Sequence, residues 1–583
     1  MMRKQYKTLI AMCLAGSMAA SALSGCGSSG TEEAKETTEV AAVSEEVAED
    51  ADSSESEGVK KLVVAIQQSA YVTDYDDNHF TNALEEEIGA EIEFILLPED
   101  PGEFQSKLSL MAAAGDDLPD LLFTGGALSI ETILQYGKQG LFLPIEEYIY
   151  DAELMPNYNS IPQEDLDFMN EASTMADGHI YSLGHYEQNI WNEVPFRTFI
   201  NKTWLDTLGL EVPTTTDELY DVLVAFRDGD PNGNGKQDEI GVYGYQSGVY
   251  GYNVLATLMN AFIAWNNNNQ NGGLMLDTDD GKTVIAPYTQ EEWREGLRYM
   301  RKLYEENLLS PSIFTDDDSQ FRATVNAEPN IVGFVSFGSL SRYENDADGN
   351  KKQNFLDLQI IDPLIGPEGV QYTPYAFSSS WQAFFVFRGC EDVELAMKLG
   401  DAFFSQKVKD KISGEYGVDW TDDPEICGQY TNGYVYKGMV DSISRVDLTE
   451  VDHWASPNNW NWRDNNPEYR SLEEEMSTVD ASLIEEFDPD DPEALADETF
   501  DMYYPRRPEP ALPVLKYTEE ESEVITDAVA NIPSFVEQTM AEFITGARDL
   551  DNGWDDYIAE INSMGLEEWI AIAQASYDRT TAE

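Results

Sequence analysis

The feature that most constrains the fold is the alternation of short apolar runs with helical patterns after residue 58. The run KLVVAI (residues 61–66) is rich in β-branched side chains and predicts a strand. A helical pattern follows, and a second apolar run, AEIEFILL (residues 90–97), predicts another strand. A β–α–β order with strands this apolar indicates a parallel sheet and therefore an α/β fold.

A third strand is predicted after the next helix. An apolar stripe through Phe104 and Leu108 predicts the helix, and Pro119 ends it before DLLF (residues 120–123). This strand leads into Gly125 and Gly126. In open α/β sheets ligands bind beyond the carboxyl ends of the strands, so the glycine turn is a candidate wall of a cleft. A plain tight turn is the alternative.

The N-terminal segment predicts export. Three basic residues precede an apolar run at residues 9–22, which ends in LSGC at residues 23–26. The run is too short to span a bilayer but typical of a secretory signal, so residues 1–25 are predicted to be a signal peptide. The final residue, Cys26, predicts a lipobox, in which the thiol carries a diacylglycerol whose two acyl chains anchor the chain stably. An ordinary signal peptide with a chance cysteine is the alternative.

Composition limits the remaining possibilities. Residues 27–58 are almost entirely Ser, Thr, Ala, Gly and acidic residues, and with Cys26 they are predicted to form a disordered acidic tether. The chain has 583 residues, so we expect two or more lobes. Its net charge of −75 would repel phosphate groups, so no nucleic-acid partner is expected.

Outside the lipobox and the signal peptide, Cys390 and Cys427 are the remaining cysteines. A disulfide between them is one alternative, and two free buried thiols are favoured.

The loop DPNGNGKQDEIG (residues 230–241) has the spacing of a metal-binding loop. Asp230, Asn232 and Asn234 occupy positions 1, 3 and 5, and Gly235 occupies position 6, as at the start of an EF-hand. The later part of the loop differs from an EF-hand, because Gly241 stands at position 12, where an EF-hand has a bidentate Glu. An N-capped helix with an apolar stripe precedes the loop. A glycine-rich turn without a metal is the alternative.

Several motifs, taken together in their order and spacing, resemble one family. They are GDDLPDLLF, NKTWLDTLGLEVPTTTDELYDVLVAF, DPNGNGKQDEIG, EGLRYMRKLYEENLLSPSIFT, PLIGPEG, CEDVELAMKLGDAFFS, YGVDW and the C-terminal stretch AEFITGARDLDNGWDDYIAEINSMGLEEWIAIAQASYDR. In these motifs the chain resembles the extracellular solute-binding lipoproteins of ABC importers, in the large oligosaccharide-type branch of family 1. The lipobox and tether are what a Gram-positive member needs.

The resemblance implies an α/β, two-lobed, periplasmic-binding-protein-like (type II) fold with hinge crossovers. By analogy, lobe one comprises residues 59–195 and about 376–440. Lobe two comprises about 196–375 and 441–583.

The resemblance also implies a structural calcium ion in the 230–241 loop. Carried over by position, the ligands are the side chains of Asp230, Asn232, Asn234, Asp238 and Glu239 and the carbonyl of Lys236. Six oxygens suit a hard cation such as calcium, and flanking glycines let the backbone wrap around it.

An enzyme is not expected. Only four histidines are present, and neither an HExxH pair nor a G-x-S-x-G elbow occurs. Paired carboxylates, as in a glycosidase, are uninformative in a chain with 110 acidic residues.

Aromatic residues among Asn, Gln, Ser and Gly are candidate contacts for sugar rings. Flat apolar faces pack on the C–H side of a pyranose, and neighbouring polar groups bind its hydroxyls. Trp191 and Trp381 are favoured because both lie near a predicted crossover. The further candidates are Gln188, Asn189, Tyr250, Tyr252, Trp265 and Trp460. Packing in the core is the alternative for each aromatic residue.

The expected function is capture of an oligosaccharide between two lobes at the extracellular face of the cell membrane. Ligand binding shifts a hinge equilibrium toward a closed form, and a monomer in that form docks on ABC permease subunits. One alternative is a lipid-anchored receptor that presents its ligand to a sensor kinase. The other is a secreted glycoside hydrolase.

Overall fold

The structure is a computed structural model. It describes residues 60–115, 118–248, 251–266, 271–338, 342–344, 352–376, 380–412, 414, 416–428, 444–448, 458–462, 465–480 and 502–581. All of them lie in one compact unit, 59–583. The predicted signal peptide, Cys26 and the acidic tether lie outside the described residues.

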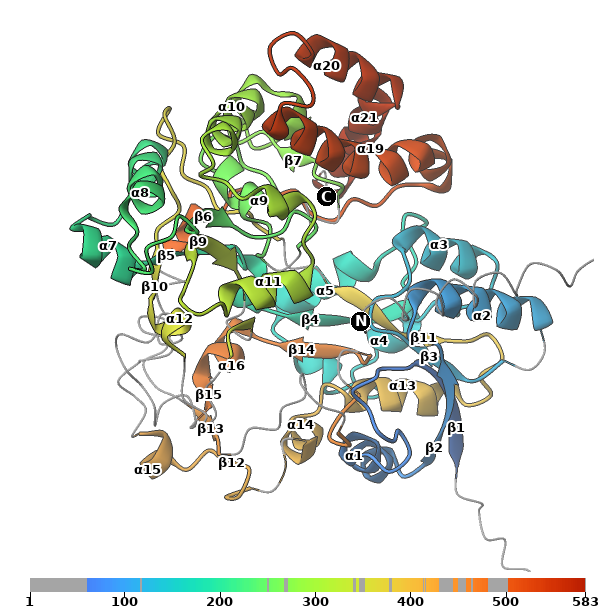
Figure 1. Ribbon diagram of the computed structural model, residues 1–583. Helices are drawn as coiled ribbons and strands as arrows, with labels where there is room; N and C mark the ends of the chain where they lie inside the picture. The colour runs from blue at the N-terminus through green and yellow to red at the C-terminus, as the bar shows by residue number, and fades with distance from the viewer. Residues whose placement is uncertain are drawn as a thin grey trace, which may run out of the picture. The chain divides into compact units, whose positions relative to one another are not determined.

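Helices and strands alternate along this unit (Figure 1). The helices are α1 (His79–Ile88), α2 (Pro101–Ala114), α3 (Ile130–Lys138), α4 (Glu146–Ile149), α5 (Gln163–Ser173), α6 (Ile190–Glu193), α7 (Lys202–Leu208), α8 (Thr216–Gly229), α9 (Val254–Met259), α10 (Glu291–Glu305), α11 (Asp318–Val325), α12 (Gln353–Leu356), α13 (Val393–Ala402), α14 (Gln406–Ile412), α15 (Pro424–Cys427), α16 (Leu472–Ser477), α19 (Glu519–Thr545), α20 (Trp554–Ser563) and α21 (Leu566–Thr581). The strands are β1 (Lys61–Gln67), β2 (Glu91–Leu97), β3 (Leu121–Phe123), β4 (Ser182–Glu187), β5 (Arg197–Asn201), β6 (Ile240–Tyr243), β7 (Met275–Leu276), β8 (Val284–Ile285), β9 (Val332–Phe337), β10 (Leu358–Ile361), β11 (Trp381–Val386), β12 (Trp420–Thr421), β13 (Arg445–Asp447), β14 (Glu468–Arg470) and β15 (Thr478–Asp480).

The first large sheet has the strand order β14-β4-β11-β3-β1-β2. β1 pairs in parallel with both β2 and β3, which confirms the parallel strands predicted from the β–α–β order. β11 runs antiparallel between β3 and β4. Successive residues of β1 point to opposite faces, so Val64 and Ile66 enter one core cluster and Ala65 the other. The sheet is therefore buried on both faces at β1 and β3, as their continuous apolar runs require.

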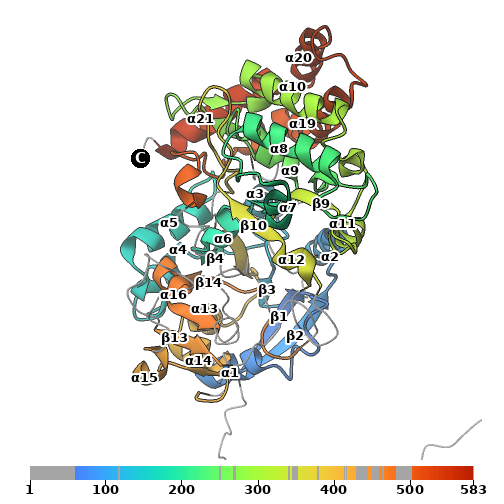
Figure 2. The same ribbon diagram turned by 60° about the vertical axis from the view of Figure 1, so that its left-hand side comes forward.

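The second large sheet has the order β10-β5-β9-β6. All six residues of β9 are buried, with Phe334 and Val335 in different core clusters. The larger of these clusters also contains Trp293 and Leu297 of α10 and Phe543 of α19. Figures 1 and 2 show α10 beside the C-terminal helices.

The chain passes between the two large sheets more than once. It leaves the first sheet after β4, enters the second at β5, and returns between β10 and β11. These two passages fall at residues 188–196 and 362–380, close to the predicted crossovers at 195 and 376. The C-terminal segment from Leu512 onward packs in the core of the second sheet.

One part of the predicted division differs from the structure. Residues 441–583 were assigned to lobe two, but β14 pairs in parallel with β4 of the first sheet. Trp462 is likewise packed against Phe80, Phe94 and Phe123 in the first sheet's core. β14 has only three residues, and its pairing is decided by tertiary contacts that no local pattern reveals. The remaining lobe boundaries stay predictions.

Two further sequence expectations can be compared with the described residues. Cys390 and Cys427 are both buried and free, which confirms the favoured alternative. Among the helices of the described part, none combines the length and the apolar character needed to cross a membrane.

Candidate functional site

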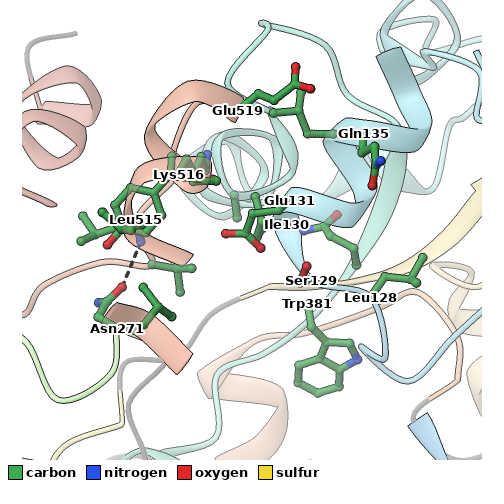
Figure 3. A pocket seen from close by; sticks show the side chains of 18 of the residues that line it. Leu128, Ser129, Ile130, Glu131, Gln135, Asn271, Trp381, Leu515, Lys516 and Glu519 are labelled. Carbon is green, nitrogen blue, oxygen red and sulfur yellow. Dashed lines mark hydrogen bonds between the residues drawn. The ribbon is translucent and has the colours of Figure 1, made fainter. Parts of the chain in front are cut away.

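A cavity of about 950 Å³ lies at the carboxyl end of β3 and the start of α3. One side of its lining comes from segments of the first sheet: residues 126–131, Lys138 and residues 380–382. The other side comes from residues 513–517, from α19 and from Trp569 of α21. Figure 3 shows the α3 residues facing the segment that carries Leu515 and Lys516, with Trp381 below them.

Trp381 is held in place by its neighbours at the wall of this cavity. Its indole stacks on the imidazole of His185, with ring centroids 4.0 Å apart and planes inclined by 15°. A Cβ at Gly126 would lie 3.3 Å from Cδ1 of the indole. Gly126 also has a φ of 76°, a backbone conformation that glycine adopts readily. The glycine turn after β3 therefore forms part of the cavity wall and leaves room for the indole.

Three polar atoms of the lining are buried without a hydrogen-bond partner. They are Nε1 of Trp381, Oγ of Ser380 and Oγ of Ser522. A buried polar group without a partner costs roughly 1–3 kcal/mol, so native proteins rarely keep one without a reason.

Charged side chains link the two sides of the cavity. Lys138 at the end of α3 forms an ion pair with Glu519 at the start of α19. Nζ of Lys516 donates to the carbonyl of Glu171 in α5. Burial lowers the pKa of Lys516 below its usual range. The lining therefore carries both signs of charge, with four glutamates and two lysines.

Asn271 fixes the segment that forms the far wall. Its buried Oδ1 accepts from the backbone N–H of Leu515 at 3.1 Å, and its Nδ2 donates to the carbonyl of Pro513 at 2.9 Å. Figure 3 shows the contact with Leu515. An irregular segment without neighbouring strands needs such partners for its backbone groups.

The 230–241 loop is a second candidate site, and none of its residues lines the cavity. It begins where α8 ends, at Asp230, whose φ is 47°. The carboxylate of Asp230 accepts from the backbone N–H of Gly235 at 3.1 Å. Nδ2 of Asn234 donates to Oδ1 of Asp238 at 2.9 Å. Oδ1 of Asn232 in turn accepts from the N–H of Asn234 at 3.1 Å, so the predicted ligands are gathered in one turn.

Glu239 is the residue of this loop that most needs a cation. Both oxygens of its carboxylate are buried and have no hydrogen-bond partner. Burial, with the nearby charges of Asp238 and Asp230, raises the pKa of Glu239. An orphaned carboxylate beside two more carboxylates fits a divalent hard cation that takes oxygen ligands. The residues present therefore fit calcium.

Of the predicted ligand residues whose side chains the structure describes, Trp381 is the one that lines the cavity. Trp191 lies in α6, and its side chain is outside the described part, as is the whole of Tyr250. Gln188 is engaged elsewhere, because its Nε2 donates to Asp165 at 2.6 Å and its Oε1 accepts from the backbone of Leu472 at 2.7 Å. Asn189 lies just before α6, where its Oδ1 accepts from the N–H of Asn192 at 3.3 Å.

The other three predicted aromatic residues pack away from the cavity. Tyr252 is 2% exposed and stacks on Tyr245, and Trp265 is 3% exposed and packs edge-on against Trp293. Trp460 stacks on His79 of α1, with ring centroids 4.4 Å apart, and so lies with the first sheet. Tyr252 and Trp265 therefore pack in the core, which was the alternative for each aromatic residue. Their polar sequence neighbours do not determine which way the rings point.

Sequence reasoning missed most of the lining. Glu131, Gln135, Asn271, Lys516 and Ser522 carried no local signal, since polar residues at the start of a helix or in a loop are common. Trp569 lies in α21. It is buried, and its ring also borders the cavity.

Comparisons with known proteins place this geometry in context. No family model matches the chain. The fructooligosaccharide ABC transporter substrate-binding protein FusA of Streptococcus pneumoniae is 26% identical over 537 residues, which are 90% of this chain and 91% of FusA. Lipoprotein LipO of Bacillus subtilis is 25% identical over 302 residues, which are 51% of this chain and 55% of LipO.

Solved structures share the fold over nearly the whole chain. FusA of S. pneumoniae in complex with kestose has a TM-score of 0.66 at 24% identity and covers 90% of this chain and 100% of its own. An EF-hand mutant of FusA, in complex with fructo-nystose, has a TM-score of 0.65 with the same identity and coverage. An HMO-binding, ABC-transporter-associated solute-binding protein from Bifidobacterium longum infantis has a TM-score of 0.70 at 22% identity and covers 90% of this chain and 99% of its own. The chain is therefore a homologue of the substrate-binding proteins of ABC transporters, which are binding proteins and not enzymes, and it has their two-domain α/β fold.

Proposed function

We propose that this protein captures a neutral oligosaccharide in the 950 Å³ cavity and delivers it to an ABC permease. The volume suits a ligand of a few sugar rings, because pockets of about 300–1,000 Å³ enclose most of a small ligand. The homologue FusA is a fructooligosaccharide-binding protein, which supports an oligosaccharide as the class of ligand.

The unsatisfied polar atoms around Trp381 carry this proposal. The indole offers an apolar face to the C–H side of a sugar ring, while its Nε1 and the hydroxyls of Ser380 and Ser522 lack partners. Such a combination of one aromatic face with a few convergent polar groups is typical of small-ligand sites. Trp191, at the first passage between the sheets, remains a proposed second contact.

A thermal-shift panel of neutral oligosaccharides that differ in linkage and length tests the ligand class. We expect one group of oligosaccharides to raise the melting temperature, and calorimetry with the best of them to give one saturable site. Trp381→Ala should weaken that binding at least tenfold, or about 1.4 kcal/mol. Tyr150→Ala is the matched control, because Tyr150 is 61% exposed and lies outside the lining. Equal affinities in both variants would remove Trp381 from the site.

We also propose that the 230–241 loop binds calcium through Asp230, Asn232, Asn234, Asp238, Glu239 and the carbonyl of Lys236. The ion would neutralise a cluster of carboxylates and hold the turn between α8 and β6. The buried, partnerless Glu239 supports this assignment, as does the existence of an EF-hand mutant of FusA.

The proposed location is the extracellular face of the membrane, with the chain held as a monomer by a lipid on Cys26. The lipobox supports the anchor, and the homologue LipO is named as a lipoprotein. Membrane fractionation of a Cys26→Ser variant tests it: the protein should move to the soluble fraction, and retention in the membrane would refute the anchor.

A further inference from the structure

A histidine and two glutamates converge behind Trp381, outside the cavity lining. β4 and β14 pair in parallel, with His185 opposite Glu468 and Glu187 opposite Arg470. Nε2 of His185 lies 3.6 Å from Oε1 of Glu187 and 4.0 Å from Oε2 of Glu468. The three donor atoms all lie within 4.8 Å of one another. The register of two strands thus gathers one imidazole and two carboxylates.

The imidazole is oriented as a ligand to a cation would be. His185 is 1% exposed, and its Nδ1 lies 2.8 Å from the carbonyl oxygen of Asn466. Since a carbonyl only accepts, Nδ1 carries a proton and donates, which leaves Nε2 as the nitrogen facing the carboxylates. Metal-ligating histidines commonly donate their other ring N–H to a carbonyl in this way.

Nε2 has no hydrogen-bond partner, although it is buried. In a neutral imidazole its lone pair would point at two carboxylates, and this contact is repulsive. A proton on Nε2 would face oxygens at 3.6 and 4.0 Å, which are beyond hydrogen-bond range. A metal ion lying between the three atoms would give each of them a partner.

The separations from Nε2 to the two carboxylate oxygens match those of donors around one small metal ion. Zn²⁺ binds nitrogen and oxygen at about 2.0–2.2 Å, so two donors lie about 3.4 Å apart at a tetrahedral angle and at most about 4.3 Å apart. The distances from Nε2 to the two glutamate oxygens, 3.6 and 4.0 Å, fall within these limits. The glutamate side chains are 19% and 20% exposed, so an ion has access from solvent.

Arg470 and Lys409 are the other charged groups near the cluster. Nη2 of Arg470 donates to Oε1 of Glu468 at 2.9 Å, while the other oxygen, Oε2, faces His185. Nη1 of Arg470 lies 3.6 Å from Oε1 of Glu187. Nζ of Lys409 donates to the carbonyl of Tyr469 at 2.6 Å and pairs with Glu474 at 3.3 Å. Arg470 therefore contacts both carboxylates. It leaves Oε2 of Glu468 toward the imidazole, whereas Oε1 of Glu187 lies 3.6 Å from both Arg470 and His185.

We propose that His185, Glu187 and Glu468 bind a divalent transition-metal ion such as Zn²⁺. The imidazole nitrogen favours such an ion over calcium, which prefers the all-oxygen loop at 230–241. Because His185 stacks under Trp381, the ion fixes the ring that supports the indole at the cavity wall. The site is independent of the ligand class proposed above.

Titration calorimetry of the full chain with ZnCl₂ tests the site, using protein without a polyhistidine tag and with calcium in excess. We expect one Zn²⁺ per chain. Glu187→Gln and Glu468→Gln, which keep the side-chain shape, should each weaken binding at least about tenfold. Glu146→Gln is the matched control, because Glu146 forms a similar pair with the exposed His179 at 2.6 Å. This variant should bind Zn²⁺ as the unaltered chain does.

Two further measurements separate metal binding from a change in folding. Co²⁺ should produce a visible absorption that Glu468→Gln lacks, and Zn²⁺ should raise the melting temperature of the unaltered chain but not that of Glu468→Gln. The proposal is wrong if no ion binds at one per chain, in which case a protonated imidazole occupies the cluster. It is equally wrong if both Gln variants bind Zn²⁺ as tightly as Glu146→Gln.

Discussion

At the scale of single residues, the candidate site depends on how closely Gly126 and Trp381 approach. Gly126 has no side chain to displace the indole, and His185 stacks on one face of the indole. The orientation of Trp381, and with it the position of its unpartnered Nε1, is therefore fixed before a ligand binds. A preorganised contact loses less conformational entropy on binding than a mobile one.

Alanine variants at Gly126 and Gly140 distinguish backbone strain from close packing against the indole of Trp381. A Cβ at residue 126 would lie 3.3 Å from the indole, whereas one at Gly140, with a similar φ of 69°, would meet nothing within 4 Å. Both alanine variants should lose about 1–2 kcal/mol of stability from the left-handed conformation. Only Gly126→Ala should also weaken oligosaccharide binding, measured by calorimetry. Equal affinity in the two variants would contradict the proposed role of the indole.

Whether a single aromatic residue lines the cavity could be predicted only where neighbouring residues in the sequence decide its position. Trp381 was favoured for its place near a crossover, and the structure puts it at the cavity. Tyr252 and Trp265 have equally polar neighbours in the sequence, yet both rings are in the core. Burial is decided by elements distant in the chain, so it could not be predicted for these rings.

At the scale of elements, the far wall of the cavity depends on one side chain. Asn271 binds backbone groups of residues 513 and 515. Asn271→Ala should leave those groups without partners, cost about 1–3 kcal/mol and weaken ligand binding. Asn531→Ala is the control, because Asn531 is exposed and bonds only to Asp527 of its own helix, α19. Unchanged melting of Asn271→Ala would contradict this account.

The turn between α8 and β6 should depend on calcium. EDTA should lower the melting temperature of the unaltered chain and added calcium should restore it, since a ligand at about 100 times its Kd stabilises by about 2.7 kcal/mol. Glu239→Gln should abolish most of this response, whereas Glu211→Gln, at an exposed position before α8, should retain it. A melt insensitive to EDTA would remove the metal from the loop.

Glu521 should contribute to the pH dependence of stability. Burial alone would raise the pKa of this carboxyl, but the ion pair with Arg579 and the bond from the N–H of Thr518 outweigh burial and lower it. A lowered pKa means that the stabilisation is present above the usual value of about 4.3 and is lost as the pH falls through the folded-state pKa. Thermal melts should show Glu521→Gln less stable by about 0.5–1 kcal/mol at pH 7, and the difference should shrink as the pH falls below about 4.3. A difference that does not shrink at acid pH would contradict this origin.

Elements with a strong local pattern could be predicted. β1, β2 and β3 have continuous apolar runs, and α8 has the Thr215–Glu218 capping box expected at its start. The three-residue strand β14 has no such run, so its place in the first sheet could not be predicted.

At the scale of the whole molecule, the described part brings two sheets and a shared cavity together from segments far apart in the sequence. Residues 126–138, 380–382 and 513–519 meet at one site. The homology to ABC transporter substrate-binding proteins and the unpartnered polar atoms at that site favour the same function. The main proposal is that the oligosaccharide binds in this cavity.

A crystal structure of the protein with the oligosaccharide that binds best in the panel tests this claim most directly. We expect electron density for a sugar ring on the face of Trp381, with hydroxyls of the sugar bonded to Ser380 or Ser522. Ligand density outside this cavity, with Trp381 and the two serines uncontacted, would contradict it.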